Sequence, residues 1–135
     1  MADTSAGADA DVAAFELYMS ALRLPRGTEA ERAARKQKLS EAATVATRVP
    51  LAAADTMIAG LELAVEALPK VERVVASDVL AGADLLGGAV TAVMRSVDIN
   101  LSSIDDAAEA ESLREGQRAR AARATALQQD LLRAR

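Results

Sequence analysis

Residues 24–28 read Leu-Pro-Arg-Gly-Thr, and residues 47–51 read Thr-Arg-Val-Pro-Leu. Each stretch lies between runs in which apolar residues recur every three or four positions, as on one face of a helix. A proline disfavours helical geometry at the residue before it and fits the first turn of a new helix, so both stretches predict helix boundaries. Four further elements complete the pattern: Asp-Val-Ala-Ala-Phe at 11–15, Ala-Ala-Arg at 33–35, Ser-Asp at 77–78 and Asp-Ile-Asn-Leu at 98–101.

The amino-terminal half is predicted to hold three of these helices. Residues 1–8 are small and polar and are expected to be disordered, and the first helix is expected from about residue 9 to residue 22. Its apolar stripe includes Phe15 and Met19, which are expected in the core. Thr28 and Glu31 have the spacing of a capping box, which starts a second helix to about residue 47. A third helix is expected from Pro50 to residue 68.

The carboxy-terminal half is predicted to hold two more helices after a break at Pro69. Residues 70–76 are expected to be a connector, and Ser77 and Asp78 are good caps for an apolar helix over about 79–101. Glycines within this helix are expected where its backbone packs closely. The tail 107–135 is expected to be a partly solvated helix. Residues 9–135 are thus predicted to form one all-α, antiparallel bundle of about five helices.

Composition limits both the partners and the chemistry. The 135 residues include 51% hydrophobic residues, one Phe and one Tyr, so a core of small side chains predicts a homo-oligomer, with a dimer as the first guess. The absence of His and Cys excludes thiol nucleophiles, disulfides and the usual zinc sites. A net charge of −4 disfavours nucleic acid as a partner. No signal peptide and no membrane span are predicted, and we expect a soluble cytoplasmic protein.

Polar residues at the predicted helix ends are the candidate site residues. Arg26 and a following basic cluster that includes Arg35 would suit an anion beside a helix N-terminus, or form a solvated helix face. The Asp11 carboxylate is able to move a proton, or to cap the first helix. Ser77 and Asp78 also have a capping alternative. A polar seam on the 79–101 helix indicates a solvent-facing side, a subunit interface or a ligand groove: Asp84, Gly88, Thr91, Arg95 and Asp98.

In their order and spacing, the quoted elements resemble the formiminotransferase-cyclodeaminase and methenyltetrahydrofolate cyclohydrolase family, helical enzymes that act on one-carbon derivatives of tetrahydrofolate. The resemblance implies a cyclodeaminase-like helical bundle that closes or opens an amidine-like or methenyl bridge by acid and base catalysis, with a folate-type small molecule as substrate and with no metal or further cofactor. The family-matching positions are Asp11, Asp78 and Arg35, expected to be catalytic, and Arg26, Ser77 and Asn100, expected to bind substrate.

The chain also departs from the family pattern. In the family a Pro- and Gly-rich segment precedes the first matching helix, and we expect this chain to be without it. It reads Val-Glu-Arg-Val at 71–74 where the family carries a Gly-Asn-x-Asn loop, and Ser96 where the family carries Asn. The alternative is therefore a repurposed or non-catalytic helical dimer, which performs another cyclisation or elimination or serves as a binding scaffold. Convergence of Asp11, Arg35, Asp78 and Asn100 on one cleft would favour the enzyme.

Overall fold

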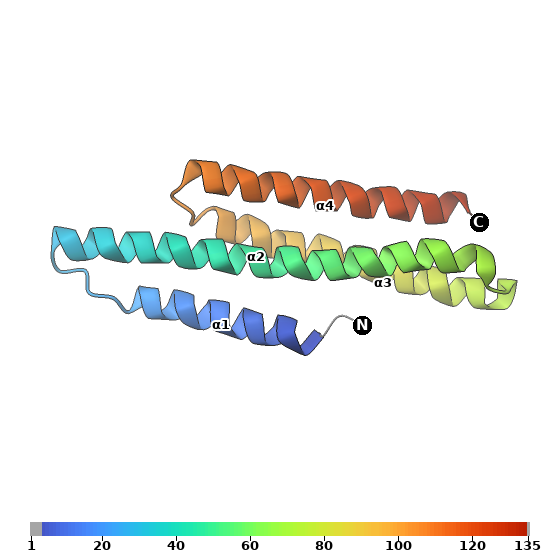
Figure 1. The fold of residues 1–135 in the computed structure, drawn as a ribbon, viewed down its shortest axis with the longest axis horizontal. Coiled ribbons are helices and arrows are strands. Elements are labelled where there is room, and N and C mark those ends of the chain that lie inside the picture. The colour runs from blue at the N-terminus through green and yellow to red at the C-terminus, as the bar shows by residue number, and fades with distance from the viewer. Residues whose placement is uncertain (1–3, 135) are drawn as a thin grey trace.

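The computed structural model describes residues 4–134, which form four α-helices and no strand. The helices run alternately up and down the long axis, so neighbours in sequence are antiparallel (Figure 1). Their bounds are α1 Thr4–Leu22, α2 Glu29–Ala67, α3 Arg73–Leu101 and α4 Ala107–Arg133, with a short 3-10 helix, η1, at Leu68–Lys70. The predicted all-α antiparallel bundle is confirmed.

The long helix α2 is the centre of the bundle. Helix α3 packs along it, and α1 and α4 lie on opposite sides of it (Figure 1). Helix α4 packs against both α2 and α3, whereas α1 packs mainly on α2. One face of α2 is therefore covered by two helices, and the opposite face is covered only in part.

Two predicted helix starts are confirmed by their caps. The Thr28 hydroxyl accepts a hydrogen bond from the backbone N–H of Glu31 at 3.1 Å, and the Glu31 carboxylate accepts one from the N–H of Thr28 at 3.0 Å. This reciprocal pair is the capping box that the sequence predicted. At the start of α4, the Asp106 carboxylate accepts hydrogen bonds from the N–H groups of Ala108 and Glu109.

The predicted boundary at Pro50 is wrong, because α2 continues through it as one helix of 39 residues. A proline inside a helix leaves the carbonyl four residues earlier without its N–H donor. Here that carbonyl belongs to Ala46, and the side-chain amide of Asn100 on α3 donates to it at 3.0 Å. The bundle consequently has four helices where about five were expected.

The start of α3 also differs from the prediction. The helix begins at Arg73, after Glu72 as its N-cap residue, so most of the expected connector 70–76 is helical. Ser77 and Asp78 therefore lie inside the helix and cap nothing; the Ser77 hydroxyl donates to the carbonyl of Val74 at 3.4 Å. Only Pro69 breaks the chain here, in η1, and no Pro or Gly follows it before Gly82.

The amino-terminal helix is longer than predicted and less buried. Helix α1 begins at Thr4, so residues 4–8, which were expected to be disordered, are helical; Met1–Asp3 lie outside the described residues. Phe15 was expected in the core but is 63% exposed, and Met19 is half-buried. Because α1 packs mainly on α2, only small side chains of α1 are fully covered: Ala14 and Ala21.

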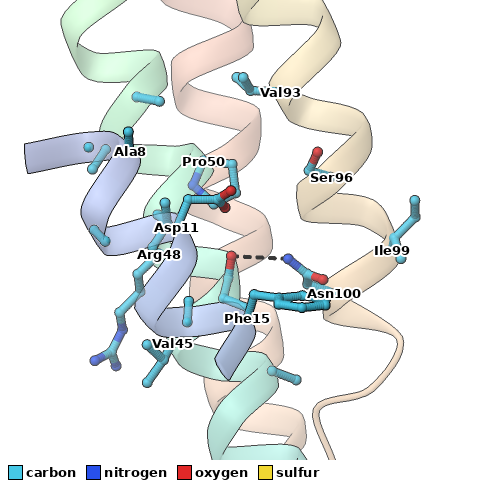
Figure 2. Close-up of a pocket in the computed structure, with 18 of the residues that line it drawn as sticks. Ala8, Asp11, Phe15, Val45, Arg48, Pro50, Val93, Ser96, Ile99 and Asn100 are labelled. Atoms are coloured by element: carbon cyan, nitrogen blue, oxygen red, sulfur yellow. Dashed lines mark hydrogen bonds between the residues drawn. The ribbon is translucent and has the colours of Figure 1, made fainter. Parts of the chain in front are cut away.

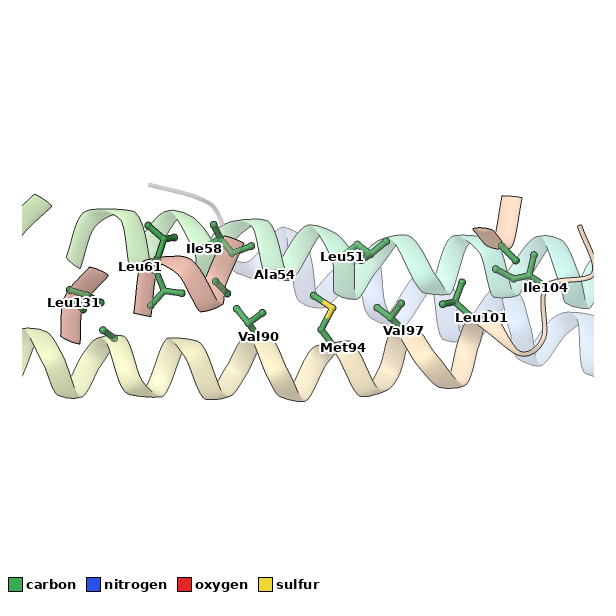
Figure 3. Close-up of a cluster of buried hydrophobic side chains, with 14 of the residues drawn as sticks. Leu51, Ala54, Ile58, Leu61, Val90, Met94, Val97, Leu101, Ile104 and Leu131 are labelled. Carbon is green, nitrogen blue, oxygen red and sulfur yellow. The ribbon is translucent and has the colours of Figure 1, made fainter. Parts of the chain in front are cut away.

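The hydrophobic core lies where α2, α3 and α4 meet (Figure 3). Its side chains recur at helical spacing on the facing stripes of the three helices, as expected for ridges that pack into grooves. Gly87 allows a close approach there, since a Cβ at this position would lie 2.0 Å from the side-chain nitrogen of Gln128. The main core residues are Leu51, Ala54, Ile58 and Leu61 of α2, Val90, Met94, Val97 and Leu101 of α3, and Leu127 and Leu131 of α4.

Helix α3 is apolar on more than its buried stripe. By length and composition alone, α3 would suffice to cross a membrane, whereas the sequence predicted no membrane span. A core helix of a soluble protein passes the same test. Its outward face carries large apolar side chains that the rest of the described chain leaves exposed: Val74, Leu85 and Ile99.

Candidate functional site

A groove with a volume of about 1330 Å³ runs between α1, α2 and α3 (Figure 2). Helix α2 forms its floor, including Ala46 and Pro50, and α1 and α3 form its walls. The groove exists because α1 and α3 both pack on α2 but hardly on each other. Small side chains on this face of α2 leave the space between the walls unfilled.

Asp11 brings a carboxylate to the α1 wall of this groove. Figure 2 shows its side chain pointing from α1 towards Pro50 on the floor. The residue is exposed, and no hydrogen bond or ion pair joins its carboxylate to another residue in the described part of the chain. Asp11 does not cap α1, because the helix begins seven residues earlier, at Thr4. A carboxylate without a partner beside an apolar floor is available for proton transfer.

Asn100 brings an amide to the opposite wall. Its Nδ2 donates to the Ala46 carbonyl, while its Oδ1 accepts no hydrogen bond from a described residue. Ser96 lies one turn earlier on the same wall, and Phe15 of α1 lies across the groove (Figure 2). Of the six residues predicted for the site, Asp11 and Asn100 are the two that line the groove.

Arg48 is a lining residue that the sequence analysis did not single out, although it lies within the quoted Thr-Arg-Val-Pro-Leu stretch. Its guanidinium points away from the groove (Figure 2) and pairs with the Glu109 carboxylate of α4 at 2.6 Å. Tyr18 of α1 was noted only as an aromatic residue and also lines the groove. Tyr18 has no helix-boundary signal, and the boundary signal near Arg48 came from Val49-Pro50, which indicates a helix start and not a site.

The predicted basic residues lie outside the groove. Arg35 donates from Nε to the carbonyl of Leu22 at 3.2 Å, which satisfies a backbone acceptor at the end of α1. Arg26 is exposed in the turn between α1 and α2, where its backbone carbonyl accepts from Arg32 at 3.4 Å. Lys36 and Lys38 form surface ion pairs with acidic residues. Lys36 and Lys38 therefore lie on a solvated helix face.

Ser77 and Asp78 lie near the start of α3 and are exposed. Asn100 is at the far end of the same helix, roughly 33 Å away at 1.5 Å per residue. Asp78 and Asn100 of one chain therefore do not contact one small ligand. The polar seam further along α3 is exposed, which agrees with a solvent-facing side. Among residues 4–134, no three acidic side chains gather as a metal site would require.

Comparison with known proteins agrees with the helical framework. The formiminotransferase-cyclodeaminase family pattern matches residues 1–134 of the chain. A methenyltetrahydrofolate cyclohydrolase from Methylorubrum extorquens (strain ATCC 14718 / DSM 1338 / JCM 2805 / NCIMB 9133 / AM1) is 37% identical over 103 residues, which are 75% of this chain and 49% of that protein. The chain thus spans about half the length of this curated relative. The match over nearly the whole sequence shows that the chain belongs to the formiminotransferase-cyclodeaminase family.

Proposed function

We propose that this chain binds a reduced folate carrying a one-carbon group in the groove between α1, α2 and α3, and acts on a C–N bond of it as a cyclohydrolase or cyclodeaminase. The relative named a methenyltetrahydrofolate cyclohydrolase supports the substrate class. The observation that carries the proposal is the groove itself, because it brings Asp11 of α1 and Asn100 of α3 to opposite walls of one apolar space.

The groove suits a flat, largely apolar ring system with polar edges. Its volume of about 1330 Å³ exceeds that of most small-molecule pockets, which hold roughly 300–1,000 Å³. The aromatic side chains of Phe15 and Tyr18 line one wall and offer a stacking surface. The polar groups are few and stand opposite one another, which is the arrangement that orients a ligand in an apolar pocket.

Asp11 is the proposed general base. In the hydrolytic direction, water adds to the methenyl carbon as one of its protons passes to the Asp11 carboxylate. Cleavage of one C–N bond then moves the hydroxyl proton to the departing nitrogen and leaves a formyl group on the other nitrogen. The proton on Asp11 is released to solvent. A positioned carboxylate contributes about 10²–10⁴-fold to such a step.

We further propose that the active form is a homodimer in which two α3 helices pack antiparallel. The outward face of α3 exposes Leu85 to 77% and Ile99 to 71%, and such a face is expected to be covered. Asp78 and Asn100 each lie 11 residues from Ala89, close to three helical turns, so all three share one face.

A twofold axis at Ala89 would therefore place Asp78 of one copy beside Asn100 of its partner. The partner would then close the open side of the groove and add a second carboxylate to it. This arrangement gives the family-matching Ser77 and Asp78 a place in the site that one chain alone does not provide. A Leu85→Arg variant would be monomeric by sedimentation; an unchanged oligomeric state in this variant would rule out this interface.

The proposed activity is tested with 5,10-methenyltetrahydrofolate, whose hydrolysis is followed by the loss of its near-ultraviolet absorbance. The purified chain is expected to accelerate hydrolysis above the buffer rate, and Asp11→Asn to abolish most of that acceleration. Asp84→Asn is the matched control, since Asp84 is an exposed carboxylate of α3 outside the groove. A rate equal to the buffer rate, without binding, would contradict the proposal; binding without turnover would identify a non-catalytic relative.

A further inference from the structure

Pro50 creates an unmet hydrogen-bond acceptor in the floor of the groove. It lies inside α2 and has no N–H to donate to the carbonyl of Ala46, four residues earlier. Proline at an interior helix position is destabilising, partly because this backbone bond is lost. A half-buried carbonyl without a donor adds to that penalty.

Asn100 supplies the missing donor from another helix. Its Nδ2 lies 3.0 Å from the Ala46 carbonyl oxygen, and this contact joins residues 54 positions apart in sequence. Figure 2 shows the bond crossing from α3 to α2. The side chain therefore takes the place of the backbone N–H that Pro50 lacks.

This bond also fixes the orientation of the Asn100 amide. A carbonyl oxygen only accepts, so the NH₂ group must face Ala46 and Oδ1 must face the other way. Every buried side-chain oxygen among residues 4–134 has a hydrogen-bond partner. The Asn100 Oδ1 makes no hydrogen bond with a described residue, so it is not one of these buried atoms. Oδ1 is therefore an acceptor open to solvent on a groove-lining residue.

We propose that Pro50 and Asn100 are a matched pair. Pro50 leaves the Ala46 carbonyl without a backbone donor, and the bond to this carbonyl holds the Asn100 amide in one orientation. In that orientation Oδ1 accepts a hydrogen bond from an N–H group of the ligand. This inference rests on the proposed function for the identity of the ligand. In a folate, the donors are the ring amide N–H and the exocyclic amine of the pteridine. Asn100 is then a binding residue and Pro50 a positioning residue.

The pairing is tested by a double-mutant cycle on the unfolding equilibrium of the full chain. Asn100→Ala is expected to raise the unfolding equilibrium constant about tenfold in the Pro50 protein, because the Ala46 carbonyl loses its donor. In Pro50→Ala, the N–H of the new residue reaches that carbonyl, and Asn100→Ala should then have less than half the effect. Equal effects in the two backgrounds would overturn the pairing.

Gln117→Ala is the matched control for this cycle. The Gln117 amide also donates to a helix carbonyl on a neighbouring element, that of Met94 at 3.1 Å, but no proline lies four residues after Met94. Gln117→Ala should therefore have the same effect in the unaltered chain and in the Pro50→Ala variant. A background dependence as large as that of Asn100 would show that Pro50→Ala disturbs the whole bundle, and would overturn the pairing as well.

The acceptor role is tested with 5-formyltetrahydrofolate, a reduced folate that does not turn over. The double variant Pro50→Ala/Asn100→Ala is expected to bind this folate about tenfold more weakly than the single variant Pro50→Ala. The Ala46 carbonyl has a backbone donor in both variants, so the difference reports the loss of Oδ1. Equal affinities would show that Asn100 is only structural and would refute the acceptor. No binding by the unaltered chain would instead refute the folate assignment and the acceptor with it, while the cycle would still decide the pairing.

Discussion

The two faces of α2 are built from different residues and do different work. Towards α3 and α4 it presents Leu51, Ile58 and Leu61, which are buried in the core. Towards α1 it presents Ala46, Pro50 and other small side chains, and a groove remains. One helix thus places most of the stabilising burial on one side and leaves the other side free for a ligand.

The largest expected effect separates the chemistry of the groove from the stability of the core. Asp11→Asn keeps the size of the side chain but removes the proposed base, so the rate of methenyl hydrolysis should fall about 10²–10⁴-fold. The unfolding midpoint should hardly change, because Asp11 is exposed and its carboxylate has no partner among the described residues. Steady-state kinetics and thermal unfolding of the same preparation check both points. A rate within twofold of the unaltered chain would remove Asp11 from the mechanism.

The next effect concerns the core face. Leu61 is fully buried, so Leu61→Ala should lower the free energy of unfolding by about 2–5 kcal/mol. Phe15→Ala is the comparison on the groove face, and it should cost well under that because Phe15 is 63% exposed. Urea denaturation of both variants measures the difference. Equal losses would mean that the groove face contributes as much to stability as the core face, and the contrast would fail.

The sequence was sufficient for the fold class and for the helix ends with strong local signals. The capping box of Thr28 and Glu31 needs only neighbouring residues, and it was found where local chemistry put it. Pro50 was misjudged because its compensation comes from Asn100, 50 residues away in sequence, and no local pattern shows such a contact.

The site was predictable only in part for the same reason. Asp11 and Asn100 were chosen by family position, and they line one groove only because both α1 and α3 pack on α2. Ser77 and Asp78 had good capping chemistry, but α3 starts at Arg73 and leaves them inside it. Phe15 has helical core spacing, yet no third helix within residues 4–134 covers α1. Spacing does not reveal how many neighbours a helix has.

A smaller effect tests how α1 is held against the bundle. Arg35→Ala removes the side-chain bond to the Leu22 carbonyl, so α1 should fray from its carboxy-terminal end at a cost of about 0.5–1.5 kcal/mol. Hydrogen exchange should quicken in α1 and stay slow in the core stripes of α2 and α3. Arg95→Ala is the control, since Arg95 is exposed and makes no side-chain hydrogen bond or ion pair with a described residue. Equally faster hydrogen exchange in α1 and in the core helices would indicate that α1 does not unfold separately from the rest of the bundle.

The smallest effect is a pH dependence of the folding stability that arises from a surface residue of α4, outside both faces of α2. Hydrogen bonds from Arg118 and Arg114 lower the pKa of Glu111 below its ordinary value. The unfolded chain therefore binds a proton at Glu111 more readily than the folded chain does. The stabilisation from the ionised Glu111 is fully present above the ordinary Glu pKa, and it is lost as the pH falls through the lowered pKa of the folded chain. Glu111→Gln should slightly flatten the acid limb of a stability–pH curve. An unchanged slope for Glu111→Gln would show that these hydrogen bonds have no effect in solution.

The central claim, that the ligand binds on the face of α2 opposite the core, is tested most directly by hydrogen exchange with and without 5-formyltetrahydrofolate. The folate is expected to slow exchange in α1 and in the groove-lining stretches of α2 and α3, and to leave exchange in α4 unchanged. Slowing confined to α4 and the core-facing side of the bundle would contradict it, and so would no slowing anywhere at saturating folate.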